Sequence, residues 1–562
     1  MQKRDWRFRL PLGVAIYLAI AGALLIAGFI FHRTLREQRA TGRFTILQIN
    51  DVYKVEGIER ETVGGLARVR ALRKALEKEG QPVLMLHGGD FLSPSVMSDF
   101  LEARPMVRCL NLLDGDENGF DDRLVVTFGN HEFDNPSQDL LAARIAASDF
   151  RWVTSTILFR DPQGGAWQPP SQRFKNVSED LVVDLDGIQV GIVALTVDGE
   201  TRDWVDYRYG SRNRLVREAL ERLKRKGAQV LVALTHQDYE EDERLAKEFP
   251  EIDLIVGGHD HSHYQKRIGH TWITKADADA KSAVRLDVAV LEDGSVIASP
   301  YKVDLGPQAA KDLAMDAAIR QARDELEKVY EEKRGKKLDA TFANTDVFLE
   351  GVEQAVRGRE TALGNLLADS IRERMNTDVA FIHGGAIRIN DNIPAGKPIT
   401  QEDMEGIFHY SNNLVSFALS RNDLLNILRN SVSKADRSSG RFLQVSCIRF
   451  RYRADTKVDP PTYEVKEDDV WICPGRNPNA PVEQWVPLRQ APEPITASTL
   501  EFLWKSGHKD GYDLFDGGVR GPKPISPTQP PIDWRKEFEA AYVSQKKPVQ
   551  KNVEERIQRV EI

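Results

Sequence analysis

The chain has 562 residues, which is too many for a single hydrophobic core and predicts at least two large domains. Charged residues make up 29% of the sequence, the net charge is −8, and no long basic run occurs. This composition argues against a protein that binds duplex nucleic acid, because such a protein needs a basic face to neutralise the phosphates.

The N-terminus combines basic residues with a long apolar run. Four of the first nine residues are Lys or Arg, and residues 12–31 contain no charged side chain. A helix of that length spans ~30 Å, the thickness of a bilayer core, and the preceding positive charges favour a cytoplasmic N-terminus. The pattern predicts a single-pass, uncleaved signal anchor over residues 1–40, with the other domains in the periplasm or outside the cell. A cleaved signal peptide is the alternative, although no small-residue cleavage site follows the run.

After residue 40, short apolar strands alternate with helical patterns. Helices are indicated where apolar residues recur every three or four positions between charged ones. This alternation predicts an α/β sandwich. The predicted strands are residues 44–50, 82–86, 125–128, 229–234 and 252–256, with a pair in 181–195 that turns at Asp186-Gly187, and the predicted helices are residues 66–76 and 214–226.

Metal-binding types of side chain follow the C-terminal ends of these strands. This edge is where open α/β sheets bind ligands, and carboxylates, a carboxamide and imidazoles gathered there predict a two-metal site with one bridging carboxylate. His259 and His261 lie two positions apart on an extended segment, so both rings can face one point. A single polar residue after a strand more often belongs to a turn or caps a helix, but six such residues in one domain argue against that interpretation. The candidate ligands are Asp51, Asp90, Asn130, His236, His259 and His261.

Five ordered motifs resemble those of the calcineurin-like metallophosphoesterases. They are Asn50-Asp51, Gly89-Asp90, Gly129-Asn130-His131-Glu132, Thr235-His236 and Gly258-His259-Asp260-His261. Later motifs resemble the C-terminal domain of 5′-nucleotidases, so the resemblance runs from about residue 43 to residue 520. These later motifs are residues 357–360, 363–369, 383–388, 412–415, 440–446 and 507–512.

The resemblance implies a four-layer α/β/β/α metallophosphoesterase sandwich joined by a helix to a second α/β domain that binds the substrate. Residues 311–334 support the helix directly, because apolar residues recur among charges without proline or glycine. We assign no chemistry to the charged C-terminal tail. The predicted segments are the anchor (1–40), the metallophosphoesterase domain (41–308), the connecting helix (309–340), the 5′-nucleotidase-like domain (341–525) and the tail (526–562).

By the same resemblance, two divalent metal ions (manganese, zinc, magnesium or iron) assist the attack of water on phosphorus. His131, oriented by Asp134, is expected to stabilise the transition state or to protonate the leaving oxygen. The expected metal ligands are Asp90 as the bridge, Asp51 and His261 in one subsite, and Asn130, His236 and His259 in the other.

The second domain is expected to supply the groups that hold the substrate. Guanidinium groups match phosphate oxygens, and an aromatic ring can stack on a nucleobase. The candidates are Arg357, Arg359, Arg388, His383, Asn412 and Tyr512.

Three positions depart from the family pattern. Tyr53 stands where a histidine is usual, and it either ligates a metal as tyrosinate or packs beside the site while water fills the position. His383 replaces an asparagine, and Asn412 replaces one of two aromatic residues that enclose the base, while Tyr512 keeps the other. The resemblance therefore predicts a phosphoric ester hydrolase, to which the N-terminal pattern adds a membrane anchor, but it leaves the preference for nucleotides open.

Alternatives to a 5′-nucleotidase remain at this point. The same metal site would serve an enzyme for cyclic nucleotides, nucleotide sugars or a non-nucleotide ester, and a degenerate binding module is a further possibility. The pairing of Cys447 with Cys473 would need an oxidising compartment and does not follow from their spacing.

Overall fold

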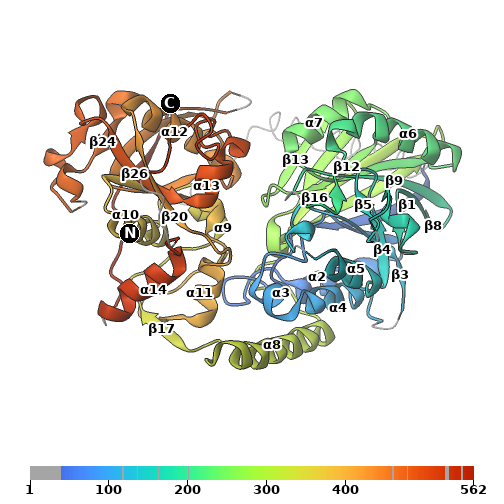
Figure 1. The fold of residues 1–562 in the computed structure, drawn as a ribbon. Coiled ribbons are helices and arrows are strands. Elements are labelled where there is room, and N and C mark those ends of the chain that lie inside the picture. Colours follow the sequence, from blue (N-terminus) through green and yellow to red (C-terminus); the bar gives the residue numbers. More distant parts are fainter. Residues whose placement is uncertain are drawn as a thin grey trace, which may run out of the picture.

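The computed structural model describes residues 40–562 except 117–118, 136, 163, 200–201, 459–460, 478, 526–530 and 546–547. Two lobes are joined along one side by a long helix, α8 (Figure 1). Residues 1–39 of the predicted anchor lie outside the described part, so the anchor stays a prediction. Within the described part, no helix is long and apolar enough to cross a membrane.

The first lobe contains two β-sheets packed face to face (Figure 1). The seven-stranded sheet has the order β16-β15-β1-β2-β3-β4-β7, and the six-stranded sheet has the order β13-β14-β12-β11-β9-β8. β1 to β4 run parallel to one another, as do β9, β11, β12 and β14, so in each sheet the carboxyl ends of neighbouring strands share an edge. The strands are β1 (Ala40–Ile49), β2 (Val83–His87), β3 (Asp121–Thr127), β4 (Phe150–Val153), β7 (Val177–Ser178), β15 (Ser282–Leu291) and β16 (Val296–Asp304) in one sheet, and β8 (Asp180–Leu185), β9 (Ile188–Thr196), β11 (Val230–His236), β12 (Leu254–Gly258), β13 (Tyr264–Ile268) and β14 (Thr271–Lys275) in the other.

Helices cover the outer face of each sheet and produce four layers. Ile46 and Leu84 of one sheet meet Ile192 and Val232 of the other in a buried core between them. Each sheet also forms a further core with the helices that cover it. The strands are continuous apolar runs because both of their faces are buried. The helices are α2 (Leu66–Glu77), α3 (Val96–Leu101), α4 (Arg104–Asn111) and α5 (Gln138–Ala146) on the seven-stranded sheet, and α6 (Arg212–Arg225) and α7 (Tyr239–Glu248) on the six-stranded sheet.

Helix α8 (Leu313–Arg334) is the connecting helix predicted from the sequence. It begins where the Asp312 carboxylate accepts hydrogen bonds from two backbone N–H groups, and it ends at Gly335 in the left-handed conformation. Its apolar stripe packs into the core of the first lobe, while Tyr330 also donates a hydrogen bond of 3.0 Å to Glu405 of the second. The helix therefore contacts both lobes.

The second lobe is built on a four-stranded sheet with the order β20-β26-β18-β21. Alternate residues of β18 face opposite sides, with Phe381 in one core and Ile382 in the other. A small sheet, β23-β22-β24-β25, lies beside it. The elements are α9 (Glu353–Val356), α10 (Ala362–Met375), α11 (Gln401–Ile407), α12 (Arg421–Val432), α13 (Glu501–Ser506), β17 (Thr341–Asn344), β18 (Val379–His383), β19 (Pro398–Thr400), β20 (Leu414–Leu419), β21 (Leu443–Ser446), β22 (Ile448–Asp455), β23 (Thr462–Glu464), β24 (Val470–Ile472), β25 (Val486–Pro487) and β26 (Ile495–Leu500).

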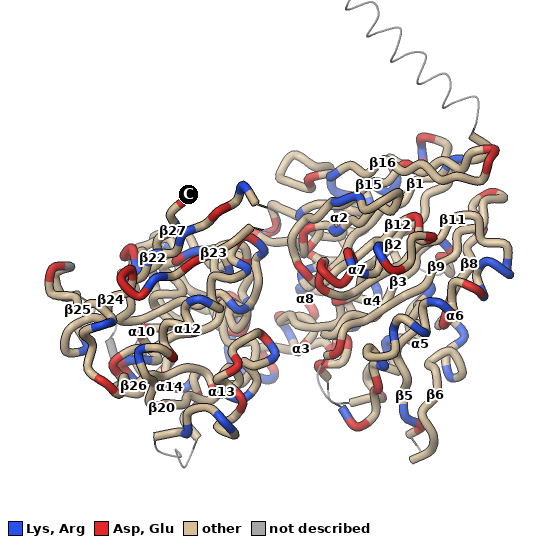
Figure 2. The backbone as a smooth tube through the Cα atoms, turned by 90° about the horizontal axis from the view of Figure 1, so that it is seen from above, with Lys and Arg blue, Asp and Glu red and all other residues tan. Residues whose placement is uncertain are grey.

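The end of the chain is part of this second lobe. Helix α14 (Trp534–Gln545) packs in one of its cores, and β27 (Ile557–Glu561) pairs in parallel with β22 (Figure 2). Arg556 is almost fully buried, and both of its terminal nitrogens lie 2.8 Å from the Asp369 carboxylate. The charged tail predicted over residues 526–562 therefore packs against this lobe, through Trp534 and Phe538 in an apolar core and through the Arg556 ion pair.

We expect Arg556→Met to lower the free energy of unfolding of the second lobe by about 3 kcal/mol, because the buried Asp369 carboxylate would lose its main partner. Arg559→Ala is the matched control, since Arg559 lies three residues further on, in β27, but pairs with Glu561, whose side chain is exposed. Urea denaturation measures both variants. Equal losses would show that Arg556 is not a special anchor.

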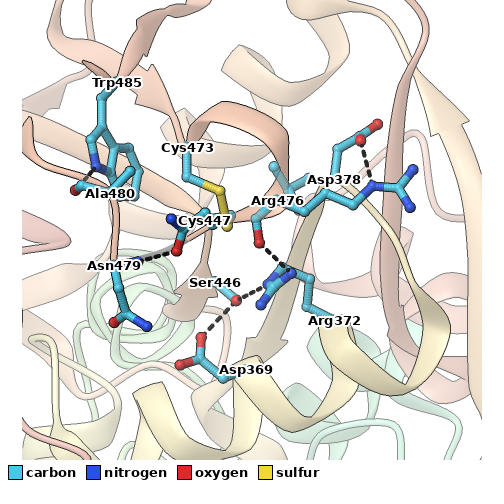
Figure 3. The surroundings of a disulfide bond; sticks show 12 residues. Asp369, Arg372, Asp378, Ser446, Cys447, Cys473, Arg476, Asn479, Ala480 and Trp485 are labelled. Carbon is cyan, nitrogen blue, oxygen red and sulfur yellow. Dashed lines mark hydrogen bonds and ion pairs between the residues drawn. A yellow bond between two sulfur atoms is a disulfide. The ribbon is translucent and has the colours of Figure 1, made fainter.

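A disulfide joins Cys447 and Cys473, the pair that the sequence left open, at the adjoining ends of β22 and β24 (Figure 3). Beside it, Ser446 donates a hydrogen bond of 2.6 Å to Asp369 and accepts one of 2.8 Å from Arg372. Asp369 therefore links the disulfide region to the buried end of the chain.

Candidate active site

The six predicted ligands lie together at the carboxyl ends of the strands. Asp51 follows β1, Asp90 follows β2, His236 ends β11, and His259 and His261 follow β12. Asn130 follows β3. Asp51, Asp90, His259 and His261 have positive φ angles, of 54°, 60°, 84° and 58°, whereas His236 and Asn130 do not. Such conformations cost L-residues of the order of 1–3 kcal/mol each and persist only where the surrounding structure imposes them. The fold therefore forces these side chains to converge.

One group of donors, the first cluster, consists of Asp51, Tyr53 and His261 with Asp90. The Tyr53 hydroxyl lies 3.0 Å from Asp90 Oδ2, 3.3 Å from Asp51 Oδ1 and 2.9 Å from His261 Nε2. His261 Nε2 lies 3.3 Å from Asp51 Oδ1. The phenol is thus one of four donors that face a common point.

The second cluster consists of Asn130, His236 and His259 with the same Asp90. His236 Nε2 lies 3.1 Å from Asp90 Oδ2 and 3.1 Å from Asn130 Oδ1. His259 Nδ1 lies 3.1 Å from Asn130 Oδ1. Asp90 Oδ2 is therefore shared by both clusters, as expected of a bridging ligand.

The donor sets fit a metal ion in their spacing. In an octahedral site with metal–ligand distances of ~2.1 Å, neighbouring ligand atoms lie ~3.0 Å apart. Ligand atoms of Asp51, Asp90 and His236 lie within 4.8 Å of one another. His236 Nδ1 lies 2.6 Å from the Gly88 carbonyl oxygen and His261 Nδ1 lies 2.6 Å from Glu353 Oε2, so each ring turns Nε2 toward its cluster.

Charge within the clusters also favours a cation. Burial would raise the pKa of the Asp90 carboxyl, but His236 and His131 hold it well below its usual range. Burial lowers the pKa of His236 and of His261, but nearby carboxylates outweigh it and raise both to about 9. Because these carboxylates attract protons onto the imidazoles, a divalent cation can take the place of those protons.

His131 and Asp134 form the predicted pair beside Asp90. His131 Nδ1 lies 2.8 Å from Asp134 Oδ2, and the backbone N–H of His131 donates a hydrogen bond of 2.8 Å to Asp90 Oδ1. Asp134 also accepts hydrogen bonds from Ser93, at 3.2 Å, and from Tyr410, at 3.1 Å. These contacts hold the His131 ring at the edge of the candidate metal centre, in a place that suits a proton donor.

Comparison with known proteins agrees with this geometry. Residues 44–263 match the calcineurin-like phosphoesterase family, and residues 340–471 match the 5′-nucleotidase C-terminal domain. The chain belongs to the calcineurin-like phosphoesterases with a 5′-nucleotidase C-terminal domain. It is therefore a phosphoric ester hydrolase.

Similar proteins cover most of its length. A snake venom 5′-nucleotidase of Gloydius brevicauda is 24% identical over 545 residues, which are 88% of this chain and 86% of that protein. The 5′-nucleotidase of Mus musculus is 24% identical, covering 74% of this chain and 76% of that protein. The crystal structure of a 5′-nucleotidase precursor from Thermus thermophilus superposes with a TM-score of 0.70 at 23% identity over 92% of this chain and 99% of that chain, which shows the fold.

Two arginines of the C-terminal domain of this phosphoesterase reach the centre. Arg388 Nη2 lies 3.2 Å from His131 Nε2, and Arg357 Nη1 lies 3.4 Å from His261 Nδ1. Both pack against Glu353, and the Nε atom of each is buried without a hydrogen-bond partner. The pair places two guanidinium groups beside the candidate metal centre, an arrangement that suits phosphate oxygens.

Three of the other substrate candidates have partners outside the two donor clusters. Arg359 is directed to solvent and pairs with Glu350. Asn412 accepts a hydrogen bond from the backbone N–H of Phe502, and the Tyr512 hydroxyl donates one to the Arg441 carbonyl while its ring is 2% exposed. The buried Tyr512 ring therefore offers no open face for a base in this structure.

His383 is buried and stacks on Phe502, with ring centroids 5.6 Å apart. Burial, and then the charges of Arg388 and Arg357, lower its pKa to about 3, so the ring is neutral. Its Nδ1 has no hydrogen-bond partner.

The sequence missed two residues that contact the site from the second lobe, Tyr410 and Glu353. Tyr410 bonds Asp134 and lies under Arg388, whose guanidinium carbon is 5.4 Å from the ring centroid. It stands only two positions before Asn412, so aligning that motif two residues earlier would have pointed to Tyr410. Glu353 gives no sequence signal, because its histidine partner is 92 residues away in the other lobe.

Proposed function

We propose that this phosphoesterase uses two divalent metal ions to hydrolyse nucleoside 5′-phosphates to nucleoside and phosphate. The observation that carries the proposal is the sharing of Asp90 Oδ2 between two donor clusters that face Arg357, Arg388 and the His131–Asp134 pair. A mononuclear site would not need the second set of donors. The names of the relatives support a nucleotide as the substrate.

The metal-binding, phosphate-binding and proton-transfer roles belong to different residues. Bound at the two clusters, divalent ions would supply Lewis-acid polarisation of the phosphoryl group and an activated water at neutral pH. Arg357 and Arg388 bind the phosphoryl oxygens and orient the ester. His131 Nε2 faces the donor Arg388 Nη2, and once Arg388 binds the phosphoryl group this nitrogen can hold a proton for the leaving oxygen. Asp134 fixes the ring through its contact with Nδ1.

Phosphate release from a substrate panel tests the proposal. Purified protein of known metal content is assayed with AMP, a cyclic nucleotide, a nucleotide sugar and bis(p-nitrophenyl) phosphate. We expect the highest kcat/KM with AMP. A preference for bis(p-nitrophenyl) phosphate or for the cyclic nucleotide would identify the enzyme as a phosphodiesterase instead. The structure gives that alternative a physical basis, because the Tyr512 ring is buried and cannot stack on a nucleobase.

Tyr53 is proposed as a ligand of the first cluster, because its hydroxyl occupies one of four donor positions there. We expect Tyr53→Phe to weaken binding of one of the two ions by at least ~10-fold and to leave the other unchanged. Competition with a chromophoric chelator measures this. In iron-loaded protein, a visible charge-transfer band that disappears in Tyr53→Phe would identify the donor as tyrosinate. Unchanged affinity, spectrum and turnover would leave Tyr53 a packing residue.

We also propose a single-pass anchor with both lobes outside the cytoplasm. The basic and apolar pattern before residue 40 supports it, as does the Cys447–Cys473 disulfide, since such bonds persist in oxidising compartments. Alkaline phosphatase fused after Ile562 should be active, because that enzyme needs export. Activity of a cytoplasm-dependent reporter at the same junction would contradict the proposal.

A further inference from the structure

Glu353 lies at the junction of the two lobes and uses its two carboxylate oxygens differently. Oε1 accepts a hydrogen bond of 2.6 Å from Arg357 Nη2 and lies 3.4 Å from Arg388 Nη1, and both arginines belong to the same lobe as Glu353. Oε2 lies 2.6 Å from His261 Nδ1 of the other lobe. The side chain is 4% exposed. One carboxylate therefore contacts both phosphate-binding arginines and a metal-ligand candidate.

The contact to His261 has a definite chemical role. A carboxylate on one ring nitrogen of a histidine fixes the orientation of the ring and raises the basicity of the other nitrogen, which is the one that binds metal. His236 of the second cluster receives the same kind of support from the Gly88 carbonyl in its own lobe. The two clusters thus differ, because only the first takes this support from the second lobe.

A second link between the lobes reaches the same cluster. The backbone N–H of Glu353 donates a hydrogen bond of 3.0 Å to Asn390, whose side-chain amide donates to Asp279. The Asp279 carboxylate accepts hydrogen bonds from the backbone N–H groups of Tyr53, at 3.0 Å, and Lys54, at 2.9 Å. Asp279 and Asn390 are buried. Docking of the second lobe therefore also holds the segment that carries Tyr53.

We propose that Glu353 is a positioning residue that completes the first metal subsite from the second lobe. Docking of that lobe then sets the orientation of His261 and of the two phosphate-binding arginines together. The proposal rests on the two-metal function given above and adds that one of the two ions depends on the second lobe.

Metal affinity tests this role directly. Glu353→Gln keeps the shape of the side chain but removes its charge, and Glu353→Asp keeps the charge but withdraws it from His261. Both variants should bind one of the two ions ~10–100-fold more weakly and the other as the wild type does, in competition with a chromophoric chelator for Zn²⁺ or Mn²⁺. Glu350→Gln is the matched control, since Glu350 pairs with Arg359 in the same segment but away from the centre. It should leave both affinities unchanged.

A second variant shows whether Glu353 acts through His261. In a His261→Ala background, adding Glu353→Gln should cause no further loss of metal affinity, because the ring that Glu353 orients is gone. A loss as large as in the wild-type background would overturn the proposal, as would wild-type metal binding by Glu353→Gln and Glu353→Asp. Those results would leave the proposed nucleotidase intact, because the substrate panel with the wild-type protein tests that function separately.

Discussion

Asp90→Asn should reduce turnover of AMP by at least ~10²-fold. The side chain is fully buried, its Oδ2 lies 3.0 Å from the Tyr53 hydroxyl and 3.1 Å from His236 Nε2, and its Oδ1 accepts the His131 N–H. Asparagine has the same size but no charge, so the variant keeps the packing and removes the one anion that both clusters share. The measurement is kcat on protein whose metal content has been determined.

Asp121→Asn separates this effect from a general loss of stability. Asp121 is also buried, but it pairs with Arg73 at the opposite end of β3 from the ligands. We expect this control to unfold more easily while the folded fraction turns over AMP at nearly the wild-type rate. Full activity of a fully metallated Asp90→Asn protein would instead mean that the shared ligand has been misassigned.

The fold of the first lobe was accessible from the sequence because its strands are buried on both faces. Each predicted strand of this lobe is present, since a short continuous apolar run is typical of a strand that is buried on both faces. The ends of the strands do not follow the apolar pattern as closely. β3 begins at Asp121, before its apolar run, and Asp122 and Arg123 of that extension are not buried, so no apolar pattern marks this start. The burial of the C-terminal segment was missed because Arg556 and Asp369 are 187 residues apart and both are charged.

The candidate site divides in the same way. The six ligand candidates belong to short motifs after strands of one lobe, so the sheets that bury the strands also bring these side chains together. Glu353 and Tyr410 contact the site only because the second lobe docks against the first. No local pattern encodes that docking. Arg359 shows the converse, since it lies in a matching motif and yet faces solvent.

His131→Asn should reduce turnover of AMP by ~10²–10⁴-fold, the usual contribution of a positioned proton donor. Asp134 holds the Nδ1 of His131, and its Nε2 faces Arg388, one of the arginines proposed to bind phosphate. Asparagine retains a polar group at this position but cannot deliver a proton. Tyr410→Phe is the control, because it removes a hydrogen bond to Asp134 and leaves the His131–Asp134 pair in place, so we expect less than a ~10-fold loss.

The leaving group distinguishes the two roles that His131 can have. A nucleoside 5′-alkoxide is a strong base and needs protonation as the ester bond breaks, whereas p-nitrophenolate is a weak base and leaves without it. If His131 is the proton donor, His131→Asn should slow AMP hydrolysis much more than hydrolysis of p-nitrophenyl phosphate. Equal losses would instead assign His131 to stabilising charge on the phosphoryl group together with Arg388. Wild-type rates with both substrates would contradict both roles, and the hydrogen bond from its backbone to Asp90 would then be the only contribution of His131 to the site.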